Sequence, residues 1–311
     1  MKTYIKKRVA VAAVSLLAVL LLLFLLMDFL PGTPFNDEKL GAAQIAVLKA
    51  EYGLDKPAVI RFFNYIGHMI TGDFGLSYSI GKNMPVGELI ADRFWLSLKI
   101  GGLAVTAGMG IGLLIGVGAA LKKNKAADWI VGAITVLGVS MPSYVAALAF
   151  SYVLGFRMKW FPILYRPGQP GFSAVLPAAA LSLPMAAAVA RTVRAEMIEI
   201  LESDYMMFAV SRGIPFRRRI WVHGLKNVMV PVIAVASPLA AVIMTGSLAV
   251  EKVFSIPGAG SLMVNAIQSN DYNVTAALAF LYSLLYIGFS LVSDLLFQWL
   301  NPRIRFCQEE K

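Results

Sequence analysis

The chain has 311 residues, of which 58% are hydrophobic and only 15% are charged, and its mean hydropathy is +0.71. Soluble domains are about half apolar and a quarter charged, and here the apolar residues form long uncharged blocks, so a soluble enzyme, a disordered chain and a fibrous protein are excluded. The formal net charge of +10 comes largely from short basic segments between these blocks, which is typical of a polytopic membrane protein and not of a nucleic-acid-binding surface.

Six apolar stretches are long enough to cross a bilayer as helices, which takes about 20 residues each. None of them alternates between apolar and polar residues, so a transmembrane β-barrel is not predicted. The predicted fold is therefore an all-α membrane protein with six transmembrane helices. The predicted spans cover about residues 9–30, 97–121, 129–156, 172–190, 228–250 and 272–299.

The first stretch follows four basic residues, so a secretory signal peptide is an alternative interpretation. Its apolar run covers residues 9–27, which is longer than the core of about 7–15 residues in a signal peptide. The segment Pro31-Gly32-Thr33 after it offers no small-x-small cleavage site. We therefore expect an uncleaved first helix.

The distribution of Lys and Arg predicts the orientation of the spans. If the N-terminus is cytoplasmic, the cytoplasmic segments carry 17 basic residues in 70 positions, and the opposite side carries 11 in 108. This asymmetry has the direction of the positive-inside rule. Both termini are therefore predicted to be cytoplasmic, with residues 301–311 as a cytoplasmic tail.

The outer loop between the first two spans contains several turn signals and two segments with apolar residues at helical spacing. These segments, residues 42–52 and 58–70, are predicted to be short helices on the extracytoplasmic surface. They are expected to pack as a cap over the helix bundle, and contact with an external partner is the alternative. Residues 1–95 are thus predicted to form one region, consisting of the first span and this loop, and residues 96–300 the core of five spans.

Within the second span, three glycines recur every four residues, at Gly108, Gly112 and Gly116. Glycine at this spacing lets two helix backbones approach closely. Prolines lie inside the next three spans, at Pro142, Pro184 and Pro238, so kinks in these helices are expected.

The cytoplasmic segment at residues 191–227 contains a predicted short helix. The amphipathic spacing of residues 191–202 indicates that the fourth span continues into the cytoplasm. Asp204 is predicted to cap a helix over residues 205–212, and Gly213 is expected to end it in the left-handed conformation. Pro215 suits the first turn of the following helix. This capped helix is a candidate docking element, and a solvated connector is the alternative. If it docks, its exposed apolar residues are expected to include Met206, Met207 and Phe208, together with the flanking Phe216.

The sequence lacks the residues of several other chemistries. No ionisable side chain lies deep in a predicted span, which disfavours an ion-coupled secondary transporter. There is no P-loop, no G-x-S-x-G and no H-E-x-x-H motif, and Cys307 has only His68 and His223 as possible partners. The chain is therefore predicted not to be an enzyme and to bind neither a metal nor a cofactor.

Several motifs resemble those of the binding-protein-dependent ABC permeases, and in particular the B-type subunit of the group that imports peptides, nickel and glutathione. Beyond the cytoplasmic segment, which also contains Asn227 and Pro231, matching runs lie at residues 52–57, 72–75, 251–260, 271–272 and 302–305. The residues that carry the family signature are Arg191, Arg194, Glu251, Phe254, Pro257, Gly258, Gly260 and Asp271. One departure is that Met207 and Phe208, followed by Ala209, stand where the general permease motif has Glu-Ala-Ala.

The resemblance implies a type I importer permease in the cell membrane that forms half of a translocation pathway. It also implies the partners: a second homologous permease, two ABC ATPase subunits that hold ATP and Mg, and an extracytoplasmic substrate-binding protein. The expected substrates are oligopeptides, with dipeptides, glutathione or nickel as alternatives. In such a permease the ATPase-coupling residues would be Asp204, Tyr205, Phe208, Ala209, Arg212, Gly213, Ile214, Pro215 and Phe216.

Overall fold

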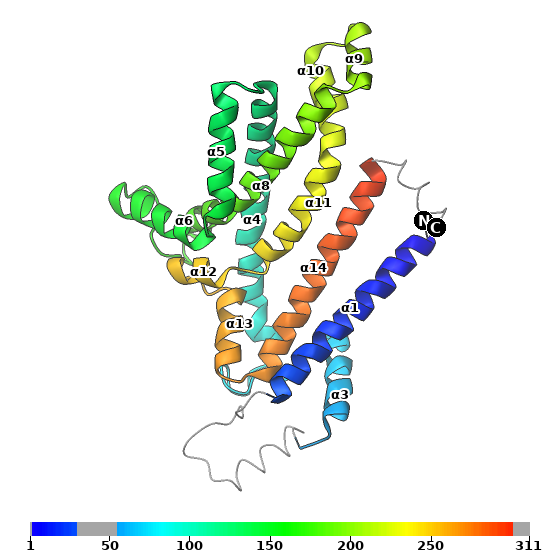
Figure 1. The fold of residues 1–311 in the computed structure, drawn as a ribbon. Coiled ribbons are helices and arrows are strands. Elements are labelled where there is room, and N and C mark those ends of the chain that lie inside the picture. Colours follow the sequence, from blue (N-terminus) through cyan, green and yellow to red (C-terminus); the bar gives the residue numbers. More distant parts are fainter. Residues whose placement is uncertain (1, 30–54, 301–311) are drawn as a thin grey trace. The chain divides into compact units, whose positions relative to one another are not determined.

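The structure, a computed structural model, describes residues 2–29 and 55–300 (Figure 1). The predicted helix at residues 42–52, the first part of the motif at residues 52–57 and the predicted tail at residues 301–311 lie outside the described residues. Within the described part, the secondary structure is helical apart from one isolated antiparallel bridge between Leu76 and Pro85. The predicted all-α class is confirmed for this part of the chain.

The helices are, in chain order, α1 (Lys2–Phe29), α3 (Ala58–Thr71), α4 (Val86–Leu121), α5 (Ala126–Ser140), α6 (Ser143–Phe150), the π-helical η1 (Ser151–Arg157), α7 (Pro170–Ser173), α8 (Val175–Leu201), α9 (Asp204–Ser211), α10 (Phe216–Arg218), the π-helical η2 (Arg219–Gly224), α11 (Leu225–Met244), α12 (Leu248–Phe254), α13 (Ala259–Gln268) and α14 (Tyr272–Leu300). Among the described residues, five helical segments are long and apolar enough to cross a membrane: Lys7–Leu26, Val86–Leu121, Val175–Leu201, Phe216–Met244 and Tyr272–Leu300. A bent pair of helices, Ala126–Ser140 with Ser143–Arg157, gives a sixth if it is one span.

The predicted span at residues 129–156, in which a kink at Pro142 was expected, corresponds to a bent pair of helices. The chain bends by 105° between α5 and α6. Pro142 has no backbone N–H to donate and takes an extended ψ of 137° as the N-cap of α6. Met141 before it is also extended, as residues that precede proline tend to be. The proline therefore breaks this helix instead of only kinking it.

The fifth apolar helix is also displaced from its predicted position at residues 228–250. It begins at Phe216 and continues through α10, η2 and α11 to Met244. The basic residues at its start lower the local hydropathy without interrupting the helix. Its end is set by Gly246, whose φ of +92° turns the chain out of the helix. The fourth helix matches its prediction better, since α8 does continue past residue 190 to Leu201.

The chain divides into two compact units, which we describe separately. Unit 1 consists of residues 1–97 and 257–287, and unit 2 consists of residues 98–256 and 288–311. In unit 1, the core is formed by Met69 of α3, Val86 and Ile90 of α4, Leu262 of α13 and Leu278 of α14. All five side chains are buried. The predicted regions 1–95 and 96–300 stay a prediction.

In unit 2, α8 is the central helix, and α5, α6 and α11 pack around it (Figure 1). The part of α4 that belongs to this unit lies against α8 through the predicted glycines. A Cβ added to Gly108, Gly112 or Gly116 would lie only 2.6–2.8 Å from a side-chain carbon and a carbonyl oxygen of α8. The predicted close approach of two helix backbones at these glycines is confirmed.

Candidate functional site

The predicted docking helix exists and is α9, which lies at the end of unit 2 where α8 ends and α10 begins (Figure 1). Ser203 is its N-cap, with an extended backbone (φ −76°, ψ 153°) and a carbonyl that accepts from the N–H groups of Met206 and Met207. The prediction that Asp204 is the cap is therefore wrong by one residue. Asp204 is the first helical residue, where its negative charge favours the positive end of the helix dipole.

The end of α9 is a Schellman motif. Gly213 has a φ of +72° and its N–H donates to the carbonyl of Val210 at 2.9 Å. The N–H of Ile214 donates to the carbonyl of Ala209 at 3.1 Å. Pro215 then takes an extended conformation as the N-cap of α10. The predicted left-handed Gly213 is confirmed, and α9 has a fixed end on both sides.

Several large apolar side chains project from α9 and from the start of α10 into open space. They form what we call the α9 surface: Tyr205, Met207, Phe208, Val210 and Phe216, all exposed. Met206, which we expected on this surface, is only 2% exposed and shares the inner face with Ala209. The expectation for Met206 is wrong because residues three apart lie on one helix face, and that face packs against α8 and η2.

Polar contacts fix α9 to its neighbours in unit 2. The Asn227 side-chain amide of α11 donates to the Tyr205 hydroxyl at 3.1 Å and to the His223 carbonyl at 3.0 Å. The Arg212 guanidinium lies over the Phe208 ring, 5.0 Å from its centroid. Lys123, in the α4–α5 turn, forms an ion pair with Glu202 just before α9. The α9 surface is therefore held in one orientation relative to α8 and α11.

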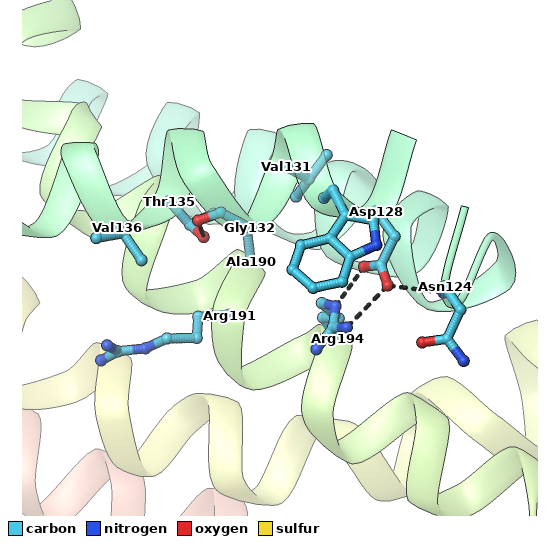
Figure 2. A pocket seen from close by; sticks show the side chains of 10 residues that line it. Asn124, Asp128, Val131, Gly132, Thr135, Val136, Ala190, Arg191 and Arg194 are labelled. Carbon is cyan, nitrogen blue, oxygen red and sulfur yellow. Dashed lines mark hydrogen bonds and ion pairs between the residues drawn. The ribbon is translucent and has the colours of Figure 1, made fainter. Parts of the chain in front are cut away.

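An ion pair joins α8 to α5 near the same end of the unit. The Arg194 guanidinium binds Asp128 with two nitrogens, Nε to Oδ1 and Nη2 to Oδ2, the latter at 2.8 Å (Figure 2). Asp128 is 4% exposed and also accepts from the backbone N–H of Asn124 at 3.0 Å. Sequence analysis identified Arg194 but missed Asp128, whose signal was an acidic residue in the first turn of an apolar helix.

A cavity of about 310 Å³ lies beside this ion pair, between α5 and α8 (Figure 2). Most of its lining is apolar, and Arg191 lies at its edge, one helical turn before Arg194. The acid in its wall, Asp128, is already bound by the Arg194 guanidinium.

The predicted signature residues at 251–260 are divided between the two units. In unit 2, Glu251 and Phe254 are buried in α12, and the Phe254 carbonyl accepts from the Tyr165 N–H at 2.8 Å. Ser255 is left-handed, with a φ of 53°. These contacts fold the end of α12 tightly, so both residues have a packing role in unit 2.

In unit 1, Gly258 is the extended N-cap of α13, and the next N–H, that of Ala259, donates to the Ser97 hydroxyl at 2.9 Å. Gly260 is buried in the first turn, and Pro257 is exposed. These residues begin α13 and connect it to the first part of α4.

Asp271 is fully buried and binds a distant loop of unit 1. One of its carboxylate oxygens, Oδ2, accepts from the Ser77 hydroxyl at 2.5 Å and from the N–H groups of Ser79 and Ile80 at 3.0 and 3.1 Å. Its backbone carbonyl accepts from the N–H of Thr275 in the first turn of α14, at 3.0 Å. Asp271 thus links the loop at residues 77–80 to the corner between α13 and α14. Sequence analysis identified Asp271 but not these partners.

Long apolar helices, a short capped helix with an apolar surface, and buried polar links between helices are the features of a multi-span membrane protein. Residues 112–306 match the family described as "Binding-protein-dependent transport system inner membrane component". The chain belongs to this family of membrane permeases, as the resemblance implied, and it is a multi-pass protein of the cell membrane.

Relatives are similar along almost their whole length. The dipeptide transport system permease protein DppB of Lactococcus lactis subsp. cremoris is 40% identical over 306 residues, 98% of this chain and 100% of the relative. The oligopeptide transport system permease protein OppB of Haemophilus influenzae is 34% identical over 307 residues, with the same coverage. DppB of Bacillus subtilis is 34% identical over 306 residues, 98% of each chain.

Proposed function

We propose that this chain is the permease subunit of an ATP-driven importer and forms half of its peptide pathway. The relatives named above are permeases for dipeptides and oligopeptides, which favours a peptide substrate over glutathione or nickel. Oligopeptides are the substrate we propose, with dipeptides as the alternative. The other half would be a second homologous permease, and an extracytoplasmic binding protein would deliver the peptide.

In this proposal the energy comes from two separate ATPase subunits that hold ATP and Mg, and the α9 surface docks on one of them. The observation that carries it is the exposure of bulky side chains such as Phe208, 59% exposed, on a helix that is fixed at both ends. A contiguous apolar patch on a protein surface usually marks a contact with another molecule. In the chain, α9 connects two helices that are long and apolar enough to span the membrane, Val175–Leu201 and Phe216–Met244. A connection of this kind lies at the membrane surface, where a partner outside the membrane can reach it.

Movement of α9 would reach the translocation pathway through contacts that are already present. Two residues separate α9 from the end of α8, and the hydrogen bond from the Asn227 side chain to Tyr205 connects α9 to α11. Within unit 2, the ion pair between Arg194 and Asp128 connects α8 to α5. Close packing at Gly108, Gly112 and Gly116 connects α8 to α4. A rigid displacement of α9 would therefore shift several membrane helices together, which is what alternating access requires.

The test is to place a charge on the α9 surface in the complete complex. Phe208→Asp should weaken the association of the ATPase subunits, measured by co-purification with the tagged chain, and abolish ATP-dependent peptide uptake. Loss of a buried Phe contact costs about 1.5–3 kcal/mol, which is roughly a 10- to 150-fold weaker association. The added desolvation of a carboxylate increases this loss.

Two controls separate docking from general damage. Phe208→Leu keeps an apolar side chain at the same position and should retain association and most uptake. Lys122→Asp places a new carboxylate in the neighbouring α4–α5 turn, away from the α9 surface, and should leave association unchanged. If Phe208→Asp behaves like Phe208→Leu, α9 is a solvated connector. If the chain alone takes up peptide under an ion gradient, the secondary-transporter reading is correct.

A further inference from the structure

Helix α3 of unit 1 has three distinct sectors around its axis. One sector packs against the unit: Met69 is in its core, Tyr65 lies against that core, and the Phe62 ring is 5.4 Å from the Phe24 ring of α1. A second sector is polar and exposed and contains Asn64, His68 and Thr71.

The third sector is apolar and exposed, and the packing of unit 1 leaves it uncovered. Phe63 is 67% exposed and Ile70 is 75% exposed, and Val59 and Ile60 are exposed beside them. At about 100° per residue, these side chains and Gly67 fall on one side of the helix. This sector, which we call the α3 face, lies between the packed sector and the polar sector.

The contacts of α3 place it alongside the membrane-spanning part of α1. The Phe62 ring of α3 contacts the ring of Phe24, which lies inside the apolar segment Lys7–Leu26 of α1. Leu23 of α1 packs against the same core as Tyr65 of α3. Figure 1 shows α3 beside the C-terminal part of α1. Because α3 touches α1 within its apolar segment, lipids that surround the end of α1 can also reach α3.

The chemistry of both helices favours lipid as the occupant of the α3 face. On α1, the side chains of Leu22, Leu25 and Leu26 around Phe24 are exposed, so an apolar surface continues along the neighbouring helix. The side chains of Arg61 and His68 on α3 lie away from its apolar face. The Arg61 guanidinium lies over the Phe24 ring. The Nδ1 atom of His68 lies 3.3 Å from the Oδ2 atom of Asp73, a residue that follows the end of α3.

We propose that α3 is an interfacial helix, with the α3 face in the acyl-chain boundary of the leaflet in which α1 ends. A helix of this kind places an apolar face in the lipid and keeps a polar face in water, and the α3 face and the Asn64–His68–Thr71 sector provide these two faces. Asp271 binds the loop at residues 77–80. Through Met69 and the turn at Gly72, α3 would keep this loop close to the membrane surface. This differs from the expected cap over the bundle, because the outer side of the helix contacts lipid.

The test uses spin labels on the full complex reconstituted in lipid nanodiscs. A Cys307→Ser background removes the single native cysteine, and Phe63→Cys and Ile70→Cys introduce labels on the α3 face, with Asn64→Cys as the matched control on the polar sector. The ratio of oxygen to nickel-chelate collision rates should be several-fold higher at positions 63 and 70 than at position 64. Val59→Cys provides another site on the same face if one variant does not assemble.

Each other result overturns the proposal in a distinct way. If positions 63 and 70 collide with the nickel chelate as often as position 64, the α3 face lies in water. If both reagents are excluded from positions 63 and 70, a protein partner covers the face. Neither result bears on whether α9 binds an ATPase, so the two proposals fail independently.

Discussion

Replacing Arg194 with glutamine should destabilise unit 2 more than replacing both members of its ion pair. Without the guanidinium, the Asp128 carboxylate, which is 4% exposed in the structure, keeps only the hydrogen bond from the Asn124 N–H. Breaking a fully buried pair from one side costs about 3–5 kcal/mol. The Arg194 side chain is 36% exposed, so water reaches the cation, and we expect a smaller loss of about 1–3 kcal/mol.

The assay is the thermal midpoint of the purified chain, in which each kcal/mol corresponds to roughly 2–4 °C for domains of comparable size. Arg194→Gln combined with Asp128→Asn removes both charges and leaves two amides that can bond to each other, so it should recover most of the loss. Arg191→Gln is the matched control, because it makes the same change on the exposed side of α8. If Arg194→Gln unfolds like Arg191→Gln, or if the double variant is no better than Arg194→Gln, the ion pair does not stabilise the unit.

The remaining predictions concern three other contacts. An alanine at Gly112 would place its Cβ 2.7 Å from a side-chain carbon of α8, so it should lower the thermal midpoint by an amount equivalent to about 1–3 kcal/mol. The control Gly110→Ala has open space around its Cβ and should leave the midpoint unchanged. Equal midpoints of the two variants would refute the close packing. The valine side chain of Gly213→Val would meet no neighbouring atom, but it would strain the backbone, whose φ is +72° at this position. Co-purification of the ATPase subunits should therefore fall while membrane insertion stays intact. Unchanged co-purification would show that the left-handed end of α9 is not needed for ATPase binding. Ser77→Ala removes one hydrogen-bond donor to the buried Asp271 carboxylate, which should cost about 1–3 kcal/mol. Amide hydrogen exchange in the loop at residues 77–80 should therefore become faster. Unaltered exchange would show that this hydrogen bond does not hold the loop.

Local sequence patterns predicted the features that depend only on neighbouring residues. Apolar length marked α4, α8 and α14, and a glycine after two helical turns marked the left-handed Gly213. Hydropathy reports the environment of a segment and not the direction of its backbone, so it could not detect the bend between α5 and α6. Proline alone was ambiguous, because Pro142 breaks its helix whereas Pro184 and Pro238 stay inside α8 and α11.

The contacts that join distant segments could not be predicted from one sequence. Arg194 and Asp128 are 66 positions apart, and Asp271 and Ser77 are 194 positions apart, so only the packing of helices brings them together. The inward orientation of Met206 was missed for the same reason. Helical spacing shows which residues share a face, but the neighbours of α9 decide which face is covered.

The most direct test of the central claim is site-specific photo-crosslinking from the α9 surface in cells. A benzoylphenylalanine in place of Phe208 should form a covalent adduct with an ATPase subunit of the importer, identified by mass spectrometry. The same group in place of Lys122, in the neighbouring turn, should give much less of this adduct. If the assembled complex yields no ATPase adduct from position 208, or yields as much from position 122, then α9 is not the element that couples ATP hydrolysis to transport.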